Sequence, residues 1–173
     1  MIVTNTACLE VRKLTIDDGH DIYEMLQELP ADDNGFINSV QGKTFDAYKE
    51  WLKRAAKNAE LVGVSECGKV GTTIFWLFEN GKPVGIAKVR HRLTDALLEQ
   101  GGNVGYAVRP SARDRGLGTK FLSLLIVECK KLGIEKILLT IQNHNKKSIR
   151  MGLTNGGKIE KITEDRHYIW IDA

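Results

Sequence analysis

The sequence predicts a mixed α/β (α+β) fold in a single domain that spans residues 1–173. Two strand-like runs flank Asn80-Gly81, which is a strong turn signal for an antiparallel hairpin. A second pair of alternating segments closes the chain, and runs with helical spacing of apolar residues lie between the strands. No repeat, low-complexity tract or linker divides the chain, which is long enough to bury about 70% of its unfolded surface.

The first half of the chain is expected to supply two helices and one strand hairpin. Thr15–Asp18 carries the hydroxyl and acidic residues of a helix start, and Pro30 ends the apolar spacing that follows. Residues 32–35 are a cluster of turn formers, and residues 60–71 contain three glycines without a clear period and are expected to form a loop. In chain order, the elements are a strand over 8–14, helices over 15–29 and 45–56, and strands over 72–78 and 84–92.

The second half is expected to continue with strands, helices and a final hairpin. Pro110 must end a strand over 103–109, because proline has no N–H to donate. The helix over 115–132 places its apolar residues on one face, and Gly133 terminates it. The other elements are a single helical turn at 95–99, a strand over 136–141, a helix over 145–155, and strands over 158–163 and 166–171.

Composition argues against several classes of protein. A net charge of +3 is too small to indicate nucleic-acid binding, for which a clustered basic face is expected. No stretch approaches the roughly 20 apolar residues that span a bilayer, and residues 1–5 lack the basic start and apolar core of a signal peptide. Cys8, Cys67 and Cys129 show no paired metal-ligand spacing. We therefore expect a cytoplasmic protein without a metal site, a disulfide framework, or a nucleic-acid or membrane partner.

The most informative segment is the strand, loop and helix over residues 106–121, which contains Arg-x-x-Gly-x-Gly at 113–118. Glycines let a ligand approach the backbone, and the free N–H groups of the first helical turn favour an anion such as a diphosphate. A P-loop would need lysine and then serine or threonine after its last glycine, but Thr119-Lys120 has the opposite order. A dinucleotide-binding loop would need a small residue where Phe121 stands.

The remaining interpretation is that this loop resembles the coenzyme-A pyrophosphate loop of the GNAT superfamily of N-acetyltransferases. The similarity extends from Lys82 to Gly157: the preceding Gly-Tyr-Ala-Val-Arg-Pro strand, the strand over 136–141 and the Asn145-x-x-Ser148 helix start follow in that family's order. The resemblance implies a GNAT-like domain whose central, mostly antiparallel sheet is splayed at the cofactor site, with helices on both faces. It also implies acetyl-CoA as the cosubstrate.

The resemblance further implies which residues hold the coenzyme. The main chain of Ala107 and Val108 is expected to pair with the pantetheine, and the Val108 N–H also to donate to the thioester oxygen. Arg113 is expected to add a charge-assisted hydrogen bond to the diphosphate. Asn145 and Ser148 fit the same group, although an asparagine N-cap and an ordinary helix-surface serine remain alternatives. The complete expected set is Ala107, Val108, Arg113, Asp114, Arg115, Gly116, Leu117, Gly118, Thr119, Asn145 and Ser148.

The general base cannot be carried over from the family, because Gly102-Asn103 stands where many relatives have a glutamate. A base is needed, since an alkylamine with a pKa of about 10 is mostly protonated at neutral pH. His91 and Glu99 are expected to flank the mouth of the site, and histidine titrates in the useful range. The alternative interpretation is a surface histidine at a strand end and a loop glutamate.

The general acid also differs from the family pattern. Gly152 occupies the position of the family's frequent tyrosine, and a side chain there is expected to point toward the coenzyme sulfur. Tyr106 and Tyr168 are expected to belong to the core, as aromatic residues in strands usually do. A thiol with a pKa near about 8.5 can leave as thiolate without an acid.

The sequence therefore predicts an acetyl-CoA-dependent N-acetyltransferase that acts on a primary amine of a small molecule or peptide. The amine attacks the thioester directly, without a cysteine nucleophile. The two missing catalytic side chains leave a second hypothesis open, which is a relative that binds or senses acyl-CoA without catalysis. Assembly as a homodimer is compatible with the sequence.

Overall fold

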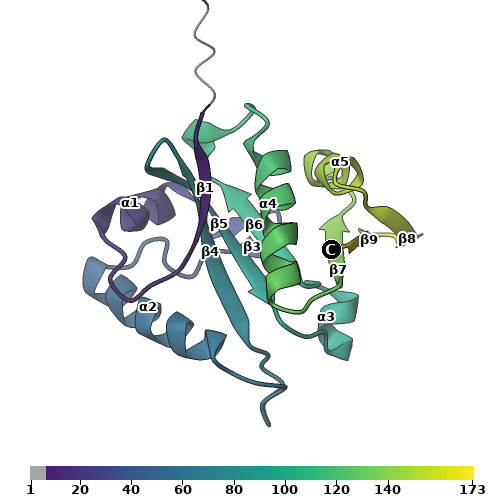
Figure 1. The fold of residues 1–173 in the computed structure, drawn as a ribbon, viewed down its shortest axis with the longest axis horizontal. Coiled ribbons are helices and arrows are strands. Elements are labelled where there is room, and N and C mark those ends of the chain that lie inside the picture. Colours follow the sequence, from purple (N-terminus) through teal and green to yellow (C-terminus); the bar gives the residue numbers. More distant parts are fainter. Residues whose placement is uncertain (1–6) are drawn as a thin grey trace, which may run out of the picture.

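The computed structural model describes residues 7–173, whose strands form two sheets and one short hairpin (Figure 1). The larger sheet is antiparallel throughout, in the order β1 (Leu9–Lys13), β4 (Thr72–Glu79), β5 (Lys82–Arg90) and β6 (Val104–Val108). The smaller antiparallel sheet has the order β7 (Lys136–Gln142), β9 (Arg166–Asp172) and β8 (Lys158–Ile162). The hairpin consists of β2 (Asp32–Asp33) and β3 (Phe36–Ile37). The expected mixed α/β architecture is confirmed.

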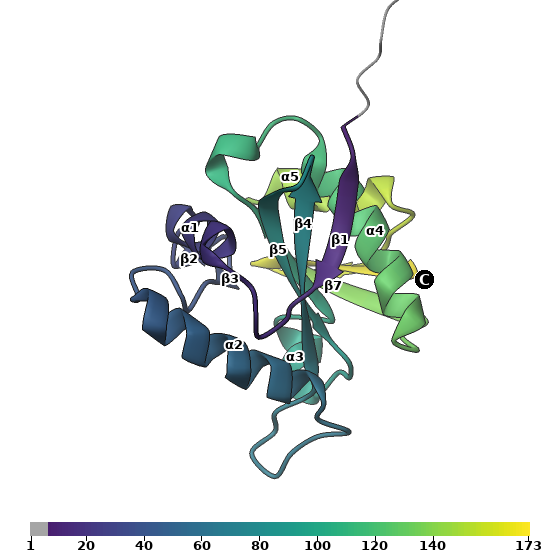
Figure 2. The ribbon, with the colours of Figure 1, turned by 60° about the vertical axis from the view of Figure 1, so that its left-hand side comes forward.

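Helices cover both faces of the larger sheet, as a view from the side shows (Figure 2). α1 (His20–Glu28) and α2 (Phe45–Ala59) lie on one face, and α4 (Leu117–Lys131) lies on the other. α5 (Lys146–Thr154) packs against β7 and β9 of the smaller sheet. Two short elements connect the strands around the site: α3 (Asp95–Glu99) and the 3₁₀ turn η1 (Pro110–Ala112).

Each face of the larger sheet has its own apolar core, because the side chains of a strand alternate between the two faces. On one face Trp76 packs with Ile22 and Leu52 from the first two helices, and all three are fully buried. On the other face Leu77 packs with Phe121 of α4. Burying one such side chain contributes about 1.5–3 kcal/mol, so the helices are held mainly by these contacts.

The first helix begins later than the sequence predicts, at His20 rather than within Thr15–Asp18. The physical reason is Asp18, which is buried and caps the preceding turn instead of the helix. Its carboxylate accepts hydrogen bonds from the Thr15 N–H at 2.9 Å and from Trp76 Nε1 at 2.6 Å. It also pairs with Arg12 at 2.8 Å. This carboxylate therefore fixes the start of α1 to the larger sheet.

Other differences from the predicted elements are small. The turn cluster at 32–35 lies within the β2–β3 hairpin, and the predicted loop at 60–71 contains one isolated bridge, between Val64 and Val70. No helix within residues 7–173 combines the length and the apolar character that crossing a bilayer requires. The expectation about a signal peptide concerned residues 1–5, which lie outside the described residues.

The two sheets meet at one point and separate from there. Asn103 precedes β6 and is joined to Leu138 of β7 by two hydrogen bonds of 2.9 Å: its backbone N–H donates to the Leu138 carbonyl, and its side-chain Oδ1 accepts from the Leu138 N–H. Beyond this point β6 is paired only with β5, and β7 only with β9. The splay that the family resemblance implies is confirmed.

Candidate active site

A cavity of about 870 Å³ lies beside β6, between the start of α4, the start of α5 and the β2–β3 hairpin. Its volume is within the usual range for sites that hold small molecules or cofactors. Among the residues expected to bind the coenzyme, all except Arg115 line this cavity. The structure thus brings together residues 107–119 and 145–148, and their role as coenzyme ligands stays a prediction.

The turn from β6 into α4 presents backbone N–H groups to this cavity. Asp114 and Gly116 both have positive φ angles, 62° and 76°, and Gly116 is the residue from which α4 starts. A Cβ atom on Gly116 would meet nothing within 4 Å, so this glycine serves the backbone conformation rather than close packing. Among the described residues, no side chain caps the start of α4. The N–H groups of its first turn are therefore available to an anion.

Gly118 has a different reason to be a glycine. A Cβ atom there would come within 2.7 Å of both Sδ and Cε of Met151 on α5. The glycine lets α4 and α5 approach each other beside the cavity, so a larger side chain at Gly118 would displace Met151 as well as reach toward a ligand.

The Arg113 guanidinium is fixed by two protein contacts. Its Nε donates to the Val108 carbonyl at 2.8 Å, and its Nη2 pairs with Asp33 of the β2–β3 hairpin at 2.6 Å. Arg113 therefore ties the end of β6 to the hairpin at the edge of the cavity. These contacts hold the side chain in one orientation. The Asp33 carboxylate also neutralises part of the positive charge that was expected to face the diphosphate.

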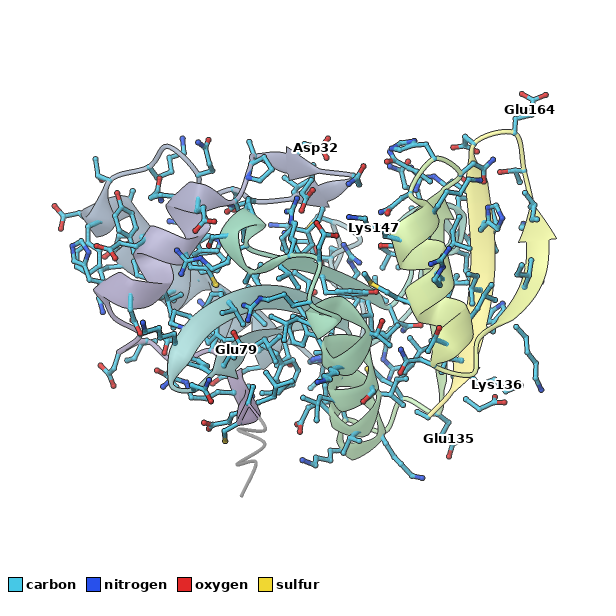
Figure 3. All side chains as sticks on the ribbon, turned by 90° about the horizontal axis from the view of Figure 1, so that it is seen from above. Asp32, Glu79, Glu135, Lys136, Lys147 and Glu164 are labelled. Atoms are coloured by element: carbon cyan, nitrogen blue, oxygen red, sulfur yellow. The ribbon has the colours of Figure 1, made fainter. Side chains whose placement is uncertain are left out.

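The neighbouring charged residues of the loop point in different directions. Arg115 lies outside the cavity lining and forms two hydrogen bonds with the Glu79 carboxylate, at 3.0 and 2.8 Å, which corrects the expectation that it faces the coenzyme. Asp114 lines the cavity and pairs with Lys147, and both side chains are exposed. In Figure 3, Lys147 lies on the side of α5 that faces the rest of the molecule. The Lys147 ammonium lowers the pKa of the Asp114 carboxyl.

The start of α5 contributes basic residues that sequence reasoning did not include. Lys146, Lys147 and Arg150 all line the cavity. The sequence did contain a signal for this. Lysines in the first turn of a helix are unfavourable next to the positive end of the helix dipole, and the first turn of α5 contains no acidic residue to offset them. Asn145 is the N-cap of α5, and its side chain accepts a hydrogen bond from the Ser148 N–H at 3.2 Å. The N-cap alternative is therefore confirmed for Asn145.

The main-chain groups of β6 point alternately toward β5 and toward the gap between the sheets, and this alternation decides which of them can meet a ligand. The Arg109 N–H donates to the Val84 carbonyl and the Arg90 N–H to the Asn103 carbonyl, so the odd-numbered residues of β6 pair with β5. Ala107 is one of these, which corrects the expectation that its main chain is free for the pantetheine. The N–H groups of Tyr106 and Val108 instead face the gap between the sheets.

A second cavity, of about 140 Å³, adjoins the first. The two cavities share Asp33, Asn34, Tyr106, Asn145 and Ser148. The second one extends between the hairpin, β5 and β7 toward α3 and β9. These shared residues form the boundary at which the two cavities adjoin.

Tyr106 lines both cavities, although sequence reasoning assigned it to the core. Its ring packs edge-on against Phe121, whereas its hydroxyl reaches the Met151 sulfur at 3.3 Å. Burial raises the pKa of the Tyr106 phenol well above its usual value, although the nearby Ser148 hydroxyl lowers it slightly. The phenol is therefore protonated at ordinary pH values, and its hydroxyl is a hydrogen-bond donor at the boundary of the two cavities.

The predicted direction of a side chain at Gly152 is wrong. A Cβ atom at this position would lie 3.3 Å from Leu139 and 3.5 Å from Ile169, in the core between α5 and the smaller sheet. It would not point toward the cavity. Gly152 is a glycine because the helix packs closely on β7 and β9, and a Cβ atom on Gly157 would lie only 2.6 Å from the Gly152 carbonyl oxygen.

The two candidate bases occupy different places. His91 lines neither cavity; its Nε2 is hydrogen-bonded to Thr73 Oγ1 at 2.8 Å, and burial together with Lys13 lowers its pKa. Its expected position at the mouth of the site is therefore wrong. Glu99 is exposed at the end of α3, beside Gln100, which lines the second cavity. Glu99 is thus near the rim of that cavity.

The fold resembles solved acetyltransferase structures over nearly its full length. An N-acetyltransferase from Staphylococcus aureus Mu50 is 21% identical, with a TM-score of 0.62, over 95% of this chain and 98% of that one. The Campylobacter jejuni N-acetyltransferase PseH in complex with acetyl coenzyme A is 12% identical, with a TM-score of 0.62, over 95% and 99%. The structure of yncA from Salmonella typhimurium with its cofactor acetyl-CoA is 20% identical, with a TM-score of 0.59, over 95% and 93%.

Sequence comparison identifies the family independently of these structures. No curated protein sequence matches the chain. The family model described as the acetyltransferase (GNAT) family matches residues 22–152, which include β5, β6, β7, the glycine-containing loop and most of α5. The chain therefore belongs to the acetyltransferase (GNAT) family.

Proposed function

We propose that this protein transfers the acetyl group of acetyl-CoA directly to a primary amine of a small molecule or peptide. The observation that carries the proposal is the pair of main-chain N–H groups at Tyr106 and Val108, which face the gap where a large basic cavity adjoins a small one. Two adjoining cavities suit a reaction between two substrates. Family membership supports acyl transfer as the reaction.

In this proposal the large cavity binds the coenzyme. The first-turn N–H groups of α4 receive the diphosphate, with the positive end of the helix dipole behind them. Arg113 and the basic residues Lys146 and Arg150 add positive charge around it. The cavity fits the coenzyme in charge and in size, because its lining includes several basic residues and its volume is large enough for a cofactor.

The reacting centre lies at the Tyr106–Val108 segment. When bound, acetyl-CoA supplies an activated acyl thioester. The Val108 N–H donates to the thioester oxygen as negative charge develops on it, and one such donor typically contributes about 2.7–4 kcal/mol to transition-state stability. The Tyr106 hydroxyl donates a hydrogen bond to the departing sulfur, which leaves as thiolate, and Glu99 near the rim of the second cavity accepts the proton from the amine.

Direct attack is favoured over a covalent enzyme intermediate, because no cysteine reaches either cavity. Cys8 and Cys67 are exposed and line neither of them. Cys129 is fully buried in α4, and burial, with a smaller effect of Glu128, raises the pKa of its thiol to about 12. A thiol in that environment is a poor nucleophile.

The test is a pair of measurements on the purified protein. Calorimetry should detect binding of acetyl-CoA, and a thiol-sensitive assay should detect release of free CoA with a panel of primary amines. Replacing Val108 by proline removes the N–H and should lower kcat at least a hundredfold. The matched control is Val108→Ala, which shortens the side chain but retains the N–H.

One observation favours the second hypothesis, in which the protein binds acyl-CoA without catalysis. Among the described residues that line the second cavity, the only carboxylate is that of Asp33, which is paired with Arg113. Tight acetyl-CoA binding without CoA release for any amine, over pH 6 to 10, would support this binding role and refute the transferase.

A further inference from the structure

The second cavity gathers three basic side chains, which are those of Lys88 and Arg90 from β5 and Arg166 from β9. The one acidic side chain that lines it, Asp33, is engaged by Arg113 at 2.6 Å. Within residues 7–173 no carboxylate forms a salt bridge with Lys88 or Arg90. The cavity therefore carries positive charge that the described part of the protein does not neutralise.

Neutral carbonyl groups hold the two charged heads in place. Lys88 Nζ donates to the Ile37 carbonyl of the hairpin at 2.5 Å and lies 4.8 Å from the centre of the Phe36 ring. Arg90 Nη1 donates to the carbonyls of Gly101 and Gly102, at 3.1 and 3.3 Å. These contacts fix the positions of the heads. They leave the Nε and Nη2 donors of Arg90 and two N–H groups of Lys88 without a protein partner among the described residues.

This arrangement is costly for folding. Lys88 and Arg90 continue the face of β5 that Ile86 occupies in the core against α1, a face on which an apolar side chain would be expected. Burial, together with the repulsion of Arg90, lowers the pKa of Lys88 to about 8, and burial also lowers the pKa of Arg90. Two like charges, both half-buried beside one cavity and without a counterion among the described residues, indicate a site for an anion.

We propose that Lys88 and Arg90 bind the anionic group, a carboxylate or a phosphate, of a small amine acceptor. The proposal rests on the proposed transferase function and names the substrate class of that same site. The planar guanidinium offers two parallel donors that match either anion, and the ammonium adds a point charge. The volume of about 140 Å³ corresponds to about five water molecules in the liquid, at ~30 Å³ each, so the acceptor is small.

The location fits an acceptor whose other end is the reacting amine. Lys88 pairs in register with Gly105, the residue before Tyr106, and Arg90 lies further along β5 toward Asn103. An anion held there lies on the far side of the shared residues from the coenzyme cavity. The amine of the same molecule then points toward the gap between the sheets.

The test measures binding, so that it does not depend on turnover. Protein saturated with CoA is titrated calorimetrically with matched amines: glycine against ethanolamine, β-alanine against propanolamine, and O-phosphoethanolamine against ethanolamine. At least one acid should bind tenfold or more tightly than its neutral partner. The carboxylate and phosphate arms then identify which anion the site prefers.

Three variants connect the preference to the cavity. Lys88→Met and Arg90→Gln should each reduce the affinity for the acid at least tenfold and leave the affinity for the neutral partner unchanged. Lys88→Arg retains the charge and should keep the preference for the acid. Lys82→Met is the matched control, because Lys82 lies on the same strand but is exposed and lines neither cavity.

The outcomes separate this inference from the proposed function. Equal binding of acids and neutral amines, or a preference that survives in Lys88→Met and Arg90→Gln, overturns the anion site even if some amine is acetylated. A charge-dependent preference without release of CoA from acetyl-CoA in the presence of any primary amine keeps the anion site and refutes the transferase. Circular dichroism shows whether each variant is folded. If Lys88→Met or Arg90→Gln is not folded, the acid preference of the folded Lys88→Arg variant is the deciding measurement.

Discussion

The side chain of Asn103 substitutes for a peptide group opposite Leu138. Its Oδ1 accepts the Leu138 N–H at 2.9 Å while its own N–H donates to the Leu138 carbonyl, also at 2.9 Å. Its Nδ2 donates in addition to the Arg90 carbonyl at 3.2 Å. One buried asparagine thus joins three strands where the two sheets part.

Replacing Asn103 by alanine should destabilise the protein by about 1–3 kcal/mol, because the buried Leu138 N–H then has no acceptor. The same change should weaken acetyl-CoA binding, since the separation of the sheets is set here. Urea unfolding and calorimetry measure the two effects. Asn103→Asp retains the acceptor for Leu138 and should recover part of the stability; identical losses in both variants would contradict this role.

Removing the Arg113 guanidinium should weaken acetyl-CoA binding by about 1.5–3 kcal/mol, or roughly 10- to 150-fold. The loss combines a contact to the diphosphate with release of the Val108 carbonyl. Asp33→Asn is the informative partner, because it frees the guanidinium from its carboxylate and should increase affinity for the coenzyme. Calorimetry on Arg113→Ala and Asp33→Asn decides between a ligand contact and a purely structural tie, for which Asp33→Asn would lower the affinity.

Tyr106→Phe should lower kcat with little change in acetyl-CoA affinity, since it removes one hydroxyl at the boundary of the two cavities. Because burial raises the pKa of this phenol well above its usual value, kcat should show no fall at high pH in the wild type. Steady-state kinetics from pH 6 to 10 test both statements. Full activity of Tyr106→Phe would show that the sulfur leaves as thiolate without help from Tyr106.

Gly152→Tyr should abolish folding rather than supply an acid, because its side chain would enter the core.

His91→Ala should leave turnover within a fewfold of the wild type at every pH. The imidazole is bonded to Thr73 and lines neither cavity, so its titration cannot serve the acceptor. Glu99→Gln is the companion, for which a loss of about a hundredfold is expected if the carboxylate removes the proton. A hundredfold loss in His91→Ala with intact acetyl-CoA binding would reverse this assignment.

Lys88→Met should stabilise the free protein at neutral pH. The pKa of Lys88 is lowered from 10.5 to about 8, so between these values the unfolded chain binds more protons and stability rises with pH. Below pH 8 the wild type carries the whole cost, at most about 3 kcal/mol. Urea unfolding should therefore show the variant to be more stable by about 1–3 kcal/mol at pH 7, with a smaller difference at pH 10. A variant that is less stable at pH 7 would refute the claim that Lys88 is kept at the expense of stability.

Local patterns sufficed for much of the fold. Asn80-Gly81 gave the β4–β5 hairpin, since that dipeptide favours one turn geometry, and apolar spacing gave α2 and α4. The helix start at Thr15–Asp18 failed because Asp18 bonds to Trp76, a residue 58 positions away. Spacing along a chain contains no information about such a partner.

The parts of the candidate site that depend on local backbone conformation could be predicted from the sequence. The parts that depend on side chains distant in the sequence could not. The positive φ at Gly116 follows from a local motif. The pairing of Arg113 with Asp33 spans 80 residues, and the direction of Gly152 depends on how α5 packs on β7 and β9. Lys88 and Arg90 did leave a trace in the sequence, since two basic residues continue an alternating apolar strand face.

The wall that the two cavities share has a thermodynamic consequence. Asp33, Asn34, Tyr106, Asn145 and Ser148 contact both spaces, so any shift of these residues on filling one cavity changes the free energy of filling the other. Such coupling is reciprocal by linkage: the factor by which coenzyme alters acceptor affinity equals the factor by which acceptor alters coenzyme affinity. Binding the two substrates in either order therefore gives the same total free energy, and the five shared residues set how large the mutual effect is.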